Sequence, residues 1–309
     1  MMEMMVRSMA LKVYAVISSE TTQRLYAEVY GFKLALIVHP KESNGRLLSH
    51  SLRAMGLGPT VFGLAMCGLG VLALLYGDFA LQWQPVPQGL PWRQGIAYLS
   101  GIITLAAGIG LFVRPIAARC VLALTVLLLC LWVLPQILNV AAAPLSVGSL
   151  LGLCETLAVM CGGLTLWLSI SRPGAMGMAR RLFGVACVVF GLSHFVYAGF
   201  TADMIPHWLP LRLGLAYATG AGHLAAGLAL LLGIRPRLAA TLEALMMSSF
   251  VLLVHVPSLL QMPPPGWAPT LRVQLTALFW ASALAGSAWI VARSLRDRPW
   301  GGVRGWEPV

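Results

Sequence analysis

The stretches LPWRQGIAYLSGIITLAAG at residues 90–108 and LPLRLGLAYATGAGHLAAG at residues 209–227 decide the fold, because they are two copies of one segment. Weaker matches continue outward, with residues 62–79 recurring at 183–200. The chain is therefore predicted to be a tandem repeat of two units of about 120 residues, as in duplicated membrane domains. The repeated motif contains Pro91, Arg93, Gly101 and Gly108 in the first unit and Pro210, Arg212, Gly220 and Gly227 in the second.

Composition places both units in a membrane. Hydrophobic residues make up 59% of the 309-residue chain and charged residues 10%, which is more apolar surface than a soluble core can bury. The apolar runs reach the roughly 20 residues that cross a hydrocarbon core. We predict an all-α integral membrane protein with eight transmembrane helices, arranged as two parallel four-helix repeats. The predicted spans are 60–78, 94–113, 117–139, 147–170, 178–198, 211–233, 237–260 and 268–291.

The predicted organisation has four parts. Residues 1–55 hold seven of the 21 basic residues and no long apolar run, which indicates a cytoplasmic extension of low order or a start site assigned upstream of Met55. Residues 56–172 form the first membrane unit and residues 173–295 the second. Residues 296–309 form a cytoplasmic tail.

Arginine placement predicts the orientation. The loops on one side of the spans are arginine-rich, whereas the opposite side has only Arg93, Arg212 and Arg272. By the positive-inside rule, both termini are cytoplasmic and the protein is a multi-pass protein of the inner (cell) membrane. The net charge of +11 is then a topology signal. Because the arginines form no continuous basic face, the expected partner is the lipid bilayer, and no nucleic acid is expected.

Ionisable residues inside the spans are the candidates for function, because burying them in a membrane is unfavourable unless they are paired or neutral. We predict a polar cavity, opening outward, formed by Glu155, His194, His223 and His255; Glu243 is a further buried candidate. All three of these histidines belong to the second unit, which we therefore predict to be the functional one. For each histidine taken alone, a neutral imidazole bonded to a neighbouring helix is the favoured interpretation.

Neither metal nor thiol chemistry is indicated. No two of the six cysteines have Cys-x-x-Cys spacing, and we assign no metal ligands. Haem ligation by His194 and His255 is the less favoured alternative, because chance often places two histidines at similar depth.

The second unit resembles the DoxX-like family of bacterial membrane proteins, here in a tandem, two-unit version. The resemblance covers residues 180–291. It rests on the stretch Gly191-Leu192-Ser193-His194-Phe195, then Met204, Pro206 and Leu209-Pro210, then Thr219-Gly220, Leu224 and Ala226-Gly227. The family implies a small four-helix membrane fold with a redox association, through quinol oxidase subunits and oxidative-stress partners. Many members carry glutamate where this chain has His223, whereas His194 and Pro210 match.

Two functional hypotheses follow, and whether the chain is an enzyme is left open. The first is a redox-associated membrane protein, as a quinone site or a subunit of an oxidoreductase complex, with quinone as cofactor and other membrane redox proteins as partners. The second is a non-enzymatic transporter of small molecules or lipids, or a membrane scaffold.

Overall fold

The computed structural model describes residues 56–261 and 264–300, so the predicted N-terminal extension and most of the predicted tail lie outside it. All regular secondary structure of the described residues is helical, which confirms the predicted all-α class. The first half consists of α4 (Leu57–Tyr76), η1 (Leu81–Trp83), α5 (Arg93–Gly110), α6 (Ala117–Leu128), η2 (Leu129–Val133), α7 (Leu134–Ala142) and α8 (Val147–Ser171).

The second half follows the connecting turn η3 (Pro173–Ala175). It consists of α9 (Gly177–Val196), α10 (Ala198–Met204), α11 (Arg212–Leu232), α12 (Pro236–Phe250), η4 (Val251–His255), α13 (Val256–Ser258) and α14 (Leu271–Ser294). α6–η2–α7 and α12–η4–α13 each form one continuous long helix.

Seven of the described helices are long and apolar enough to cross a membrane, as expected of a multi-pass membrane protein. They are α4, the continuous helix Ala117–Ala142, α8, α9, α11, the continuous helix Pro236–Ser258 and α14. The predicted span 94–113 corresponds to α5, which has 18 residues and is less apolar because it begins with Arg93 and Gln94.

Glycines bring the first two long helices of each half into backbone contact. A Cβ atom added at Gly70 would lie 2.9 Å from the carbonyl oxygen of Gly101, and one added at Gly191 would lie 2.7 Å from that of Gly220. These positions have room only for the hydrogen atom of a glycine side chain, so small residues set the distance between α4 and α5 and between α9 and α11. Contacts between Gly63 and Gly108 and between Gly184 and Gly227 repeat this pattern about two turns away.

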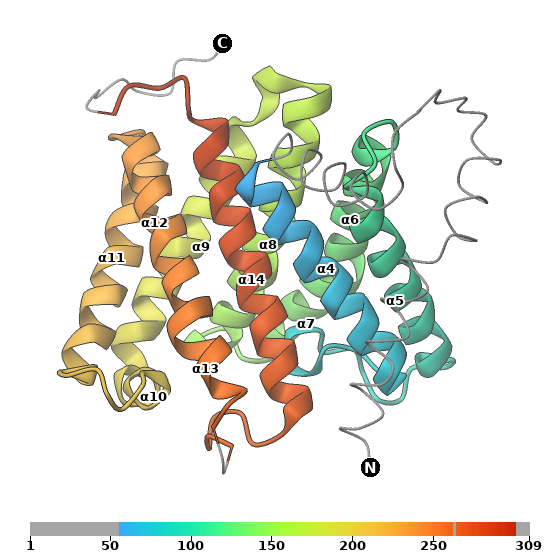
Figure 1. Cartoon of the computed structure of the whole chain (residues 1–309), viewed down its shortest axis with the longest axis horizontal. Coiled ribbons are helices and arrows are strands. Elements are labelled where there is room, and N and C mark those ends of the chain that lie inside the picture. The colour runs from blue at the N-terminus through green and yellow to red at the C-terminus, as the bar shows by residue number, and fades with distance from the viewer. Residues whose placement is uncertain (1–55, 262–263, 301–309) are drawn as a thin grey trace, which may run out of the picture. The chain divides into compact units, whose positions relative to one another are not determined.

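The two halves meet through their first and last long helices. α4 packs along α14, and Figure 1 shows these helices side by side although they lie at opposite ends of the described chain. α9 packs along α8 in the corresponding way, and α8 also contacts α14. A Cβ atom at Gly286 would lie 2.6 Å from the backbone nitrogen of Phe62, so α14 and α4 approach as closely as helices within one half.

Both continuous helices contain a π-helical segment directly before a proline. η2 precedes Leu134-Pro135, and η4 precedes Val256-Pro257. Proline removes one backbone donor and its ring crowds the preceding turn, and local widening of the helix relieves that clash. In the second half this distortion includes His255, so the proline helps to set where that side chain points.

An ion-pair network joins the halves beyond the end of α4. The carboxylate of Asp78 accepts hydrogen bonds from Arg93, at the start of α5, and from Arg272, at the start of α14. Partial burial acts to raise the pKa of Asp78, but the bonds from Phe79 N–H and the two guanidinium groups hold it below its ordinary 3.8. Asp78 thus acts as a structural clamp between the starts of α5 and α14.

Candidate functional site

A cavity of about 990 Å³ lies among α7, α8, α9, α10, α11, α12, η4 and α14. Its wall also includes residues of η1 and of the α7–α8 turn. These two segments and α10 lie at the end of the bundle that the sequence predicts to face outward, so the cavity is near that end. All four predicted site residues, Glu155, His194, His223 and His255, line this cavity. That they serve a ligand stays a prediction.

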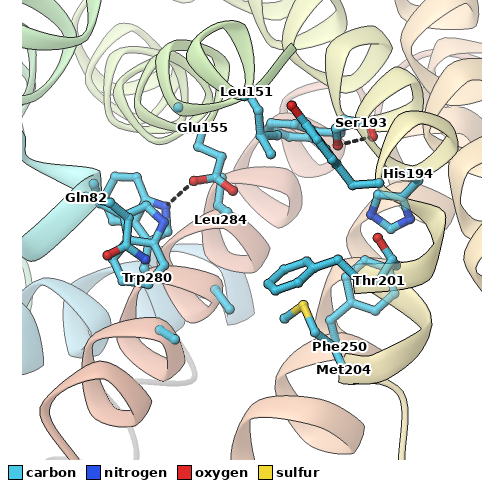
Figure 2. Close-up of a pocket in the computed structure, with 18 of the residues that line it drawn as sticks. Gln82, Leu151, Glu155, Ser193, His194, Thr201, Met204, Phe250, Trp280 and Leu284 are labelled. Atoms are coloured by element: carbon cyan, nitrogen blue, oxygen red, sulfur yellow. Dashed lines mark hydrogen bonds between the residues drawn. The ribbon is translucent and has the colours of Figure 1, made fainter. Parts of the chain in front are cut away.

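Most of the cavity wall is apolar, and its polar groups are separated. Figure 2 shows Glu155 and Trp280 on one side of the cavity and His194 on the other, with Phe250 and Met204 nearby. No lysine or arginine is among the described residues that line it. The cavity therefore suits an apolar molecule that carries a few oxygen or nitrogen atoms, and it offers little to a strongly anionic one.

His223 forms a fully buried polar contact with Glu243. Its Nδ1 lies 2.7 Å from Oε1 of Glu243, and the two side chains are 3% and 0% exposed. The imidazole ring is held between Phe190 and Phe250, with ring centroids at 5.7 and 5.8 Å. A carboxylate that engages one imidazole nitrogen fixes the orientation of the ring and leaves the other nitrogen for a ligand.

His194 lies next to His223, with ring centroids 5.0 Å apart and the rings nearly perpendicular. Its Nδ1 lies 2.9 Å from Oγ1 of Thr219, whose hydroxyl donates to backbone carbonyl oxygens of its own helix. The hydroxyl oxygen therefore accepts from Nδ1–H, so Nε2 is the free nitrogen of a neutral His194.

His255 lines the cavity from η4 and has an unsatisfied atom. Its Nδ1 is buried and has no hydrogen-bond partner among the described residues. The ring makes an edge-to-face contact with Trp267, at 5.6 Å between centroids. A buried polar atom without a partner is unfavourable by about 1–3 kcal/mol, and this one belongs to a residue that lines the cavity.

Glu155 belongs to an aromatic cluster on the other side of the cavity. Nε1–H of Trp280 donates to its Oε2 at 3.3 Å. Trp280 is stacked on Trp132 with centroids 4.7 Å apart and an angle of 6°. The indole donor of Trp280 holds the carboxyl group against the cavity wall.

A further polar group comes from the first half, and the sequence interpretation missed it. Gln136, which follows the proline after η2, donates to the carbonyl oxygen of Gln82 at 2.9 Å. Asn139, one turn later, donates to Oε1 of Gln136 at 3.1 Å. All three residues line the cavity. The signal available in the sequence was Pro135, which aligns near Pro257. A proline follows the distorted turn in each half, and Gln136 lies directly after the proline of the first half.

The remaining predicted motif residues are structural. Gly101, Gly108, Gly220 and Gly227 lie at the helix contacts described above, and Arg93 binds Asp78. Pro91 and Pro210 lie on the surface before α5 and α11, and Arg212 begins α11. Among the described residues no three His, Cys, Asp or Glu side chains converge as metal ligands would.

Comparison with known proteins shows that the second half is similar to a described family. A family model described as "Domain of unknown function (DUF8561)" matches residues 183–292, which cover the second half from α9 to α14. The chain matches none of the curated proteins and none of the solved structures with which it was compared. The matched segment contains His194, His223, Glu243 and His255, so the three cavity-lining histidines belong to the part of the chain that is similar to that family.

Proposed function

We propose that this protein is a DoxX-like, redox-associated membrane protein whose cavity binds the head group of a quinone. The observation that carries the proposal is a mostly apolar cavity lined by His255, whose buried Nδ1 has no partner among the described residues, together with His223 and Glu155. A quinone is an apolar ring with carbonyl oxygens on opposite edges. The cavity offers imidazole groups on one side and indole and carboxyl groups on the other, with Phe190 and Phe250 also in its wall.

Carriage of a small molecule or lipid without chemistry is the second candidate. The cavity is lined by both halves, and sites between repeats are typical of transporters. The two candidates differ in what they require. A carrier needs the cavity to open to both sides of the membrane, whereas a quinone site needs one opening through which the head group enters.

We also propose that α5 crosses the membrane as the eighth span, and that the halves are parallel four-helix repeats with both termini cytoplasmic. The equivalent glycine contacts in α4–α5 and α9–α11, and the equivalent pairs α4–α14 and α8–α9, support this arrangement. Periplasmic and cytoplasmic reporters fused after residues 90, 175, 205 and 300 should report outside, inside, outside and inside. A periplasmic signal after residue 175 would contradict the orientation.

Quinone binding can be measured through the tryptophans of the wall. Trp83, Trp267 and Trp280 line the cavity, and quinones quench indole fluorescence on contact. Decylubiquinone added to purified protein in nanodiscs should quench the emission with saturation. Ala281→Phe, which fills the cavity from α14, should weaken binding by tenfold or more, on the order of 1.4 kcal/mol.

The matched control is Leu245→Phe, on the lipid-facing side of α12, where the side chain is 51% exposed. Its binding curve should equal that of the wild type. Linear, non-saturating quenching of the wild type, or equal curves for the wild type and Ala281→Phe, would contradict the proposal.

A further inference from the structure

The pair formed by His223 and Glu243 determines which hydrogen-bonding group a ligand must present. Its two atoms lie 2.7 Å apart, and neither residue has another charged side chain bonded to it among the described contacts. From α9, Cys187 donates to the same carboxylate oxygen at 3.5 Å, and His194 contacts the His223 ring. The titratable groups that face the pair are therefore Cys187 and His194.

A buried pair in a membrane core is most stable with no net charge, since an isolated charge there is strongly unfavourable. Two protonation states meet this condition without placing a proton on Oε2 of Glu243, a buried atom that has no hydrogen-bond partner among the described residues. In the first, a carboxylate accepts from Nδ1–H of an imidazolium; in the second, a neutral carboxyl group donates to Nδ1 of a neutral imidazole. In both states the proton on Nε2 is present, so Nε2 is a hydrogen-bond donor.

The first half of the chain lacks both partners at the equivalent positions. Thr104 aligns with His223 in the repeated segment, and its hydroxyl donates to the carbonyl oxygen of Ser100 at 2.7 Å. Val121 precedes the π segment η2 by as many residues as Glu243 precedes η4, and it is equally buried. The histidine and the carboxyl group are thus both present in one half and both absent from the other, as expected if they act together.

We propose that Nε2–H of His223, held by Glu243, donates a hydrogen bond to a carbonyl oxygen of the ligand, so that the cavity selects carbonyl-bearing rings over rings of the same shape without one. Glu243 is a positioning residue, because it acts through His223. This inference rests on the proposed quinone site and adds to it the specificity-determining atom. His194, whose free Nε2 is an acceptor, cannot supply the same bond while it is neutral.

The test compares two probes and two proteins by the fluorescence assay. The probes are decylubiquinone and a decyl-substituted methylated benzene, which has a similar ring and tail but no carbonyl group; the second is measured by displacement of the first. The variant His223→Thr/Glu243→Val places in the second half the residues that the first half carries. Wild type should prefer the quinone by about tenfold, and the variant should lose that preference while binding the benzene derivative as before.

Infrared spectra of decylubiquinone with one isotopically labelled carbonyl supply a measurement that needs no variant. In wild type the stretching band of one carbonyl should move to lower frequency relative to the quinone in empty nanodiscs. Unshifted bands for both carbonyls, or an equal preference in wild type and variant, would overturn the assignment of His223 and leave quinone binding intact. Failure of wild type to bind decylubiquinone at all would refute the proposed function itself.

Discussion

Replacing Gly220 with leucine is expected to abolish most of the folded protein. A Cβ atom at this position would lie 2.9 Å from Cβ of His194 and 3.2 Å from the carbonyl oxygen of Gly191. Neither neighbour is the end of a flexible side chain, so α9 and α11 must separate. Overpacking of a tight contact costs about 1–3 kcal/mol or more, and in a membrane close packing is a main source of helix association.

Gly214→Leu is the matched control, because it lies in the same helix and its nearest neighbour would be Cβ of Leu211 at an ordinary 3.7 Å. Thermal unfolding in detergent and the monodisperse fraction in gel filtration should separate the two variants. Equal stability of Gly220→Leu and the parent would show that the helices do not meet at this glycine. Gly101→Leu should behave like Gly220→Leu if the halves pack alike.

Replacing one member of the buried His223–Glu243 pair should lower the free energy of unfolding far more than replacing both. His223→Thr leaves the Glu243 carboxyl group buried without its imidazole partner, and loss of one member of a buried ion pair costs about 3–5 kcal/mol. The double variant His223→Thr/Glu243→Val leaves no charge behind, so its free energy of unfolding should fall less than that of His223→Thr alone.

A double-mutant cycle with Glu243→Val measures this coupling by reversible unfolding in mixed micelles. A coupling energy of about 2 kcal/mol or more is expected for a pair in direct contact at this depth. If the two single changes have additive effects on the free energy of unfolding, His223 and Glu243 contribute to stability independently. The assignment of His223 as the specificity-determining donor would then lose its basis.

The helices could be predicted because length and hydropathy alone define a membrane helix. The span predicted at 147–170 is the helix Val147–Ser171, in which the hydroxyl of Ser146 caps the N–H of Ser149. The span predicted at 268–291 is the helix Leu271–Ser294. That shift arose because Thr270 caps α14, a side-chain interaction that an apolar window does not detect.

The site was predictable in part. Because ionisable groups are unfavourable inside a membrane, the sequence pointed to Glu155 and the three histidines as site residues. The structure brings all four to one cavity. Which groups pair was not predictable, because pairing depends on the rotation of one helix about its axis relative to the next. Glu243 on α12 faces His223 on α11, and Trp280 on α14 faces Glu155 on α8, contacts separated by 20 and 125 residues in sequence.

The most direct test of the account is to map where a quinone sits. An azido-substituted ubiquinone analogue is photolysed with the protein in nanodiscs, and the labelled peptides are identified by mass spectrometry. Labels should fall on cavity-lining segments of α9, α11 and η4, near His194, His223 and His255, and should disappear when excess decylubiquinone is present. Labelling confined to lipid-facing positions such as Leu245, without competition by decylubiquinone, would contradict a quinone site in this cavity.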